Sequence, residues 1–121
     1  MAKKILVIDD AEDLLELTRR LLESRGYQVI PLQDGDQAMT VIREHRPDLV
    51  IMDMLMPGLD GEEICHAIKS EPLFAHLPVI ITTGQFLEGD SSSPQFKKAD
   101  SYLRKPFDPE ELLNRVREFL P

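Results

Sequence analysis

The sequence predicts an α/β fold in which a five-stranded parallel sheet lies between two layers of helices. Short apolar runs such as Ile5-Leu6-Val7-Ile8 do not alternate with polar residues, which is typical of strands buried on both faces. Segments with the apolar spacing of amphipathic helices separate these runs, and this alternation favours parallel strands joined by right-handed crossovers. The length of 121 residues suits one domain, so residues 1–121 are expected to share one core.

The expected elements are, in chain order, strand 5–8, helix 12–25, strand 27–32, helix 35–46, strand 49–54, helix 62–70, strand 79–81, strand 101–104 and helix 109–120. One further helix, the fourth of five, is needed before the last strand. It is predicted to be short or mobile and to begin near Pro94, because residues 89–93 are polar and rich in helix breakers.

The first helix and second strand are placed by spacing and by breakers. Leu14, Leu17 and Leu21 recur at helical spacing, and Leu15 and Leu22 widen this apolar stripe on the first helix. Gly26 follows that helix at the position of a C-terminal cap. Pro31 has no N–H for a central ladder, so the second strand is expected at the sheet edge.

The later elements are delimited mainly by turn residues. Asp34-Gly35 precedes the second helix and Pro47 stops it. The turn pairs Pro57-Gly58 and Asp60-Gly61 separate the third strand from the third helix. The last helix is the most clearly delimited, because Asp108 can cap it and Pro109 suits its first position.

Composition excludes several classes of function. The chain has 22 acidic and 14 basic residues and a net charge of −8, which disfavours direct binding to nucleic acid and to anionic membranes. No apolar run approaches the roughly 20 residues that span a bilayer, and Met1-Ala2-Lys3-Lys4 does not begin a signal peptide. The single cysteine, Cys65, excludes an internal disulfide, so a cytoplasmic location is expected.

Polar side chains follow the expected strands at one rim of the sheet. Asp9-Asp10 follows the first strand, Asp53 and Thr83 end the third and fourth, and Lys105 ends the fifth. In open α/β sheets, ligands bind outside these carboxyl ends. Each residue alone has a structural explanation, such as an aspartate that caps a helix or a lysine in solvent. Together they indicate a site.

Three carboxylates at one rim predict a cation. Two unit charges about 4 Å apart repel by about 4 kcal/mol at an effective dielectric constant of ~20. Proteins relieve such repulsion by protonation or by binding a cation. Mg²⁺ prefers oxygen ligands and keeps positions open for water or phosphate. The sequence therefore predicts that Asp9, Asp10 and Asp53 bind Mg²⁺.

Four segments have residues typical of one family: Ile8-Asp9-Asp10, Asp53-Met54-Leu55-Met56-Pro57-Gly58-Leu59-Asp60-Gly61, Pro78-Val79-Ile80-Ile81-Thr82-Thr83-Gly84 and Tyr102-Leu103-Arg104-Lys105-Pro106-Phe107. In this order and separation they resemble the CheY-like receiver domain of two-component response regulators. The resemblance covers the whole chain. It implies a flavodoxin-like fold of strand order 2-1-3-4-5 and a receiver domain over residues 1–121, with no output domain in the chain.

The resemblance also implies roles at matching positions. Asp53 would be the phosphoryl acceptor, the residue modified to 4-aspartylphosphate. Asp10 would bind Mg²⁺ directly and Asp9 through water, and Asp53 and the backbone carbonyl of Leu55 would complete the protein ligands.

Three other residues would act on the phosphoryl group or respond to it. Lys105 would hold a phosphoryl oxygen, and Thr83 would donate its hydroxyl once the group arrives. Tyr102 would be an aromatic switch that turns inward as Thr83 moves. The neighbouring Thr82 is expected to be an ordinary strand residue rather than the threonine whose hydroxyl binds the phosphoryl group.

These roles imply a receiver in a phosphorelay. Its donor would be a sensor histidine kinase or a histidine phosphotransfer protein, and its downstream effector is unknown. Such a protein is no enzyme in the usual sense, because it catalyses only its own phosphorylation and dephosphorylation. The alternative is a pseudo-receiver that binds partners without phosphoryl chemistry. A haloacid dehalogenase-type phosphatase is disfavoured, because it needs a second aspartate where this chain has Leu55.

Overall fold

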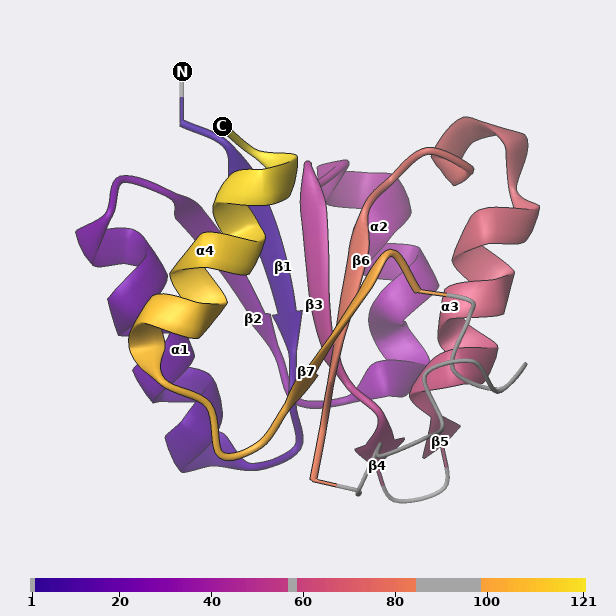
Figure 1. The fold of residues 1–121 in the computed structure, drawn as a ribbon. Helices are drawn as coiled ribbons and strands as arrows, with labels where there is room; N and C mark the ends of the chain where they lie inside the picture. The colour runs from indigo at the N-terminus through magenta and orange to yellow at the C-terminus, as the bar shows by residue number, and fades with distance from the viewer. Residues whose placement is uncertain (1, 57–58, 85–98) are drawn as a thin grey trace.

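The computed structural model describes residues 2–56, 59–84 and 99–121, and its centre is a five-stranded parallel sheet (Figure 1). The strand order is β2-β1-β3-β6-β7, which confirms the predicted order 2-1-3-4-5 and places Pro31 on an edge strand. The strands are β1 (Lys4–Ile8), β2 (Gln28–Leu32), β3 (Leu49–Asp53), β6 (Val79–Thr83) and β7 (Ser101–Arg104).

Helices cover both faces of this sheet, as the apolar runs predicted. In Figure 1, α1 and α4 lie on one side of the sheet and α2 and α3 on the other. Two short 3-10 turns lie in the described connections, Gly35–Gln37 before α2 and Pro72–Phe74 after α3. The α-helices of the described residues are α1 (Glu12–Ser24), α2 (Ala38–His45), α3 (Gly61–Ser70) and α4 (Pro109–Phe119).

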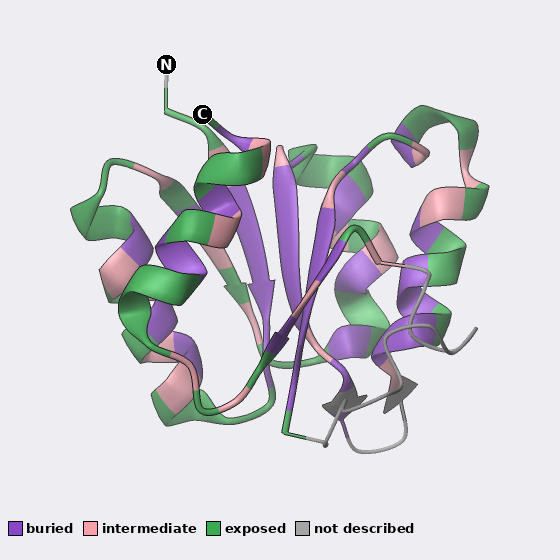
Figure 2. Cartoon of the chain, viewed as in Figure 1, coloured by how far each residue is buried: buried purple, intermediate pink, exposed green. Residues whose placement is uncertain are grey.

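Each face has its own apolar core. Neighbouring residues of one strand point to opposite layers, so Ile5 and Val7 pack with α1 and α4 while Leu6 and Ile8 pack with α2 and α3. Figure 2 shows the result, with buried strands at the centre of the sheet and helices that are exposed on their outer surfaces. Cys65 of α3 is fully buried in the second of these cores, where it acts as a small apolar side chain.

Of the apolar stripe predicted on α1, Leu15 and Leu22 are buried, but Leu17 is not. The side chains buried from α1 are Leu15, Thr18 and Leu22, whereas Leu17 is 64% exposed. Leu14 and Leu21 are half-buried and line a groove together with Pro109 and Leu112 of α4. The reason is tertiary, because α1 contacts both the sheet and α4 and its apolar surface is wide enough to serve both.

The connection between β3 and α3 contains more structure than the turn pairs predicted. Leu55–Met56 (β4) pairs in antiparallel register with Leu59–Asp60 (β5), which makes a small second sheet. Asp60 then caps α3 by accepting a hydrogen bond from the Glu62 N–H. The hairpin therefore brings the start of α3 back to the end of β3.

Two other expectations concern the second half of the chain. Asp108 does cap α4, and with Glu111 it forms a reciprocal capping box. The predicted short or mobile helix near Pro94 lies outside the described residues. Among those that are described, no helix has both the length and the apolar character needed to cross a membrane.

Candidate functional site

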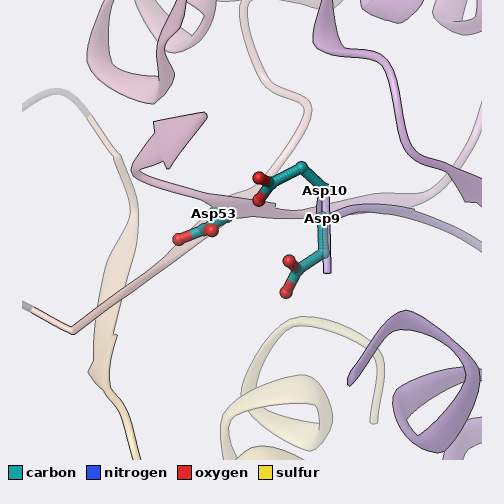
Figure 3. A group of neighbouring side chains, drawn as sticks. All are labelled: Asp9, Asp10 and Asp53. Carbon is teal, nitrogen blue, oxygen red and sulfur yellow. The ribbon is translucent and has the colours of Figure 1, made fainter. Parts of the chain in front are cut away.

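The carboxyl ends of β1 and β3 bring together the three predicted aspartates. β1 and β3 are adjacent and in register, with Ile8 opposite Met52, so Asp9 and Asp53 emerge side by side. One carboxylate oxygen each from Asp9, Asp10 and Asp53 lie within 4.8 Å of one another (Figure 3). The predicted convergence of these carboxylates at the sheet rim is confirmed.

Lys105 reaches the same cluster from the end of β7. Its Nζ lies 3.1 Å from Asp9 Oδ2 and 3.5 Å from Asp53 Oδ2. Its backbone N–H donates to the Thr83 carbonyl at 2.7 Å, which fixes the Lys105 backbone beside β6. Lys105 is therefore an ammonium placed between two of the three carboxylates.

The environment of Asp53 raises the pKa of its carboxyl above the ordinary value. Burial raises the pKa of the Asp53 carboxyl, the Lys105 ammonium opposes that shift, and the charges of Asp9 and Asp10 add to it. When the three carboxylates are ionised, Lys105 balances only part of their negative charge. A divalent cation would reduce the remaining repulsion. Its donors are all carboxylate oxygens, the set that suits Mg²⁺.

Neither Asp9 nor Asp10 is the N-cap residue of α1, which is the structural role that a single aspartate at this position could have. The cap position of α1 is Ala11, with no side-chain cap hydrogen bond. Asp9 is 6% exposed and uses Oδ1 to accept from the Ala11 N–H, which leaves Oδ2 facing Lys105. Asp10 is exposed at the rim.

The other predicted site residues lie around this cluster. Thr83 ends β6 and is 1% exposed, whereas Thr82 is paired with Asp53 across the sheet, as expected of a strand position. Leu55 begins β4 two residues after Asp53. Tyr102 lies in β7 and its hydroxyl donates to Glu62 of α3. Sequence reasoning missed Glu62, which looked like an ordinary first-turn acid.

Gly61 is a second residue that sequence reasoning missed, although the Asp60-Gly61 pair signals it. The Gly61 N–H donates to the Met54 carbonyl at 2.6 Å. A Cβ at position 61 would lie 2.7 Å from the Asp53 backbone oxygen and 2.9 Å from Met54 Cα. Only glycine allows the amino end of α3 to pack this closely against the backbone of Asp53.

We therefore expect Gly61→Ala to destabilise the domain by about 1–3 kcal/mol, because backbone atoms must move to admit the methyl group. Urea unfolding measures the change. Gly84→Ala is the control, since a Cβ there meets no atom within 4 Å. Equal unfolding midpoints for the two variants would contradict the close approach at Gly61.

Comparison with known proteins identifies the family. The model of the response regulator receiver domain family matches residues 5–117. The transcriptional regulatory protein PhoP of alkaline phosphatase synthesis from Bacillus subtilis is 38% identical over 120 residues, which are 99% of this chain and 49% of that protein. The chain thus spans about half the length of the curated relatives it matches.

Solved structures agree in fold over almost the whole chain. CheY4 of Vibrio cholerae superposes with a TM-score of 0.87 at 27% identity, covering 98% of this chain and 99% of that one. TrrA of Thermotoga maritima, solved in complex with Mg²⁺ and BeF, gives a TM-score of 0.86 at 30% identity and covers 97% and 98% of the two chains. With the family match and the strand order, these likenesses show that the chain belongs to the receiver domain family of response regulators.

Proposed function

We propose that Asp53 of this receiver domain accepts a phosphoryl group from a phosphohistidine on a histidine kinase or a phosphotransfer protein. An Asp53 carboxylate oxygen attacks the phosphorus, the P–N bond breaks, and the imidazole leaves with its electron pair and is then protonated. The observation that supports this role is the position of Lys105, whose Nζ lies 3.1 Å from Asp9 and 3.5 Å from Asp53 within a cluster of three carboxylates.

The charges of the site explain why a metal would be needed. Three carboxylates and Lys105 leave two negative charges uncompensated, and the incoming phosphoryl group brings about two more. We propose that Asp10, Asp53 and the Leu55 carbonyl bind Mg²⁺ directly and that Asp9 binds it through water. Bound there, Mg²⁺ would offset negative charge on the phosphoryl oxygens.

The chain's own residues position the reaction. Lys105 is held by its Asp9 pair and by its backbone bond to Thr83, so its ammonium is fixed before a donor arrives. The buried Thr83 hydroxyl lies at the end of the neighbouring strand, where we propose that it donates to a phosphoryl oxygen. Catalysis here would be mostly positioning and electrostatic stabilisation, confined to the protein's own modification.

Labelling with a small phosphodonor tests this function. With acetyl phosphate and Mg²⁺, the intact mass should rise by one phosphoryl group, and hydroxylamine should remove it because the linkage is an acyl phosphate. With EDTA the gain should disappear. A chain that stays unlabelled by acetyl phosphate and by phosphorylated kinases alike would instead be a pseudo-receiver.

An apolar groove beside the site offers a place for the phosphodonor. Leu14 and Leu17 of α1 and Phe107 and Leu112 near α4 line it. A second hollow continues from Leu14 and Phe107 to Lys105, which contacts the carboxylates. A protein that brings a phosphohistidine to Asp53 must lie against this rim, so we propose that the donor covers the groove.

Leu17→Glu should slow transfer from a phosphorylated kinase about tenfold or more, because it puts a charge at the centre of the proposed contact. Labelling by acetyl phosphate should be unchanged, since Leu17 lines the groove but not the hollow that reaches Lys105. Leu73→Glu is a matched control, because Leu73 is also 64% exposed but lies outside the groove. Equal transfer to both variants would place the donor elsewhere.

We also propose a cytoplasmic location and a single receiver domain over residues 1–121. The single cysteine of the sequence, Cys65, is buried, which supports the location.

A further inference from the structure

A hydrogen-bonded chain links the switch residue Tyr102 to the amino end of α3. The Tyr102 hydroxyl donates to Glu62 Oε1 at 2.6 Å and accepts from the Ala99 N–H at 3.2 Å. Tyr102 points to the α3 side of the sheet, where its ring packs against the core that includes Ile64 and Cys65. The hydroxyl is therefore held from two sides, by α3 and by the backbone just before β7.

The Glu62 carboxylate is placed unusually for a charged residue. Glu62 is 5% exposed, whereas the next residue, Glu63, is exposed to solvent. Burial of a carboxylate is costly unless strong donors contact it. A short O–H···O⁻ bond is charge-assisted and among the stronger hydrogen bonds of proteins. The contact with Tyr102 is thus a specific interaction within the protein.

Glu62 is also fixed relative to the phosphoacceptor. It follows Gly61 directly, and Gly61 packs against the backbone of Asp53 and Met54 with no room for a Cβ. The Gly61 N–H bond to the Met54 carbonyl and the Asp60 cap hold this first turn in place. A displacement of the Asp53 backbone would therefore be transmitted to Glu62.

We propose that Glu62 is a positioning residue of the receiver switch: its buried carboxylate holds the Tyr102 hydroxyl and ties β7 to the backbone beside Asp53. This inference rests on the proposed role of Asp53 as phosphoryl acceptor. It adds a second connection to Tyr102, through the amino end of α3, beside the one expected through Thr83. Loss of the Glu62 acceptor would leave Tyr102 less well held and less responsive to events at Asp53.

The composition of the chain makes Tyr102 easy to observe. The sequence contains two tyrosines and no tryptophan, so Tyr27→Phe leaves Tyr102 as the only tyrosine. Tyrosine labelled with carbon-13 at Cζ then gives one resonance, which reports the hydrogen bonding and ionisation of the Tyr102 hydroxyl. Burial and the bond to Glu62 raise the pKa of Tyr102 well above its usual range, so the hydroxyl stays protonated at neutral pH.

The first measurement compares variants without any phosphoryl analogue. In the Tyr27→Phe background, Glu62→Leu should move the Cζ resonance toward that of free tyrosine, and Glu62→Gln should move it less because the amide oxygen still accepts. Glu63→Leu removes the same charge one residue away and should leave it unchanged. A resonance that Glu62→Leu does not move overturns the proposal. If Glu62→Leu does not fold, Glu62→Gln decides in its place, because it also exchanges the carboxylate for a weaker acceptor.

The second measurement adds Mg²⁺ and beryllofluoride as a phosphoryl analogue. In the parent, the Cζ resonance should shift on addition, and in the Glu62 variant that shift should shrink at least about twofold, as expected when a coupling contact is lost. A rise in melting temperature verifies that the analogue is bound. An undiminished shift overturns the role of Glu62, whereas absence of analogue binding in the parent itself would count against the Asp53 site.

Discussion

Asp53→Asn should abolish phosphoryl incorporation while the domain remains folded. The amide nearly reproduces the shape of the carboxylate but lacks its negative charge and is a poor nucleophile toward phosphorus. Asp53 lies at the rim of the sheet and belongs to neither apolar core, so the substitution leaves the cores untouched. Removing one of the three carboxylates also reduces electrostatic repulsion in the metal-free protein.

Intact mass after incubation with acetyl phosphate and Mg²⁺ measures this effect, and melting temperature verifies the fold. Asp13→Asn is the control, because it removes an equal charge from an exposed position in the first turn of α1 and should retain full labelling. If Asp53→Asn acquires the same added mass as the parent, the acceptor is another residue, and Asp10 would be tested next.

The site could be predicted from sequence because topology alone brings its residues together. Once the apolar runs are assigned to parallel strands, Asp9, Asp53, Thr83 and Lys105 must emerge at one rim, whatever the details of packing. Adjacent strand order then makes Asp9 and Asp53 neighbours, as the 4.8 Å cluster shows. No helix orientation needs to be known for this result.

The features that sequence reasoning missed depend on tertiary packing. The five leucines of α1 form an apolar stripe of helical period, but the period does not say that Leu15 and Leu22 are buried while Leu17 is exposed. Glu62 looks like an acid that complements the helix dipole, and its contact with Tyr102 joins residues 40 positions apart. Local patterns contain no information on such a pair, because it exists only once α3 and β7 are packed.

Mg²⁺ should raise the melting temperature of the domain, and Asp10→Ala should remove most of that rise. A ligand at about 100 times its dissociation constant adds about 2.7 kcal/mol if it binds only the folded state. For a domain of this size, that corresponds to roughly 10 °C. Asp10 is exposed and, unlike Asp9, is not paired with Lys105, so its loss removes a proposed metal ligand with little effect on packing.

The metal-free protein should respond in the opposite direction. The charge of Asp10 raises the pKa of Asp53, which means that the two carboxylates repel each other in the folded state. Asp10→Ala should therefore melt at a higher temperature than the parent in EDTA and gain little from Mg²⁺. Asp13→Ala, which lies outside the cluster, should keep the full metal response. Calorimetry in EDTA and in Mg²⁺ at matched ionic strength separates binding at the cluster from general screening. Identical melts of the parent in the two buffers would show that the three carboxylates do not form a cation site.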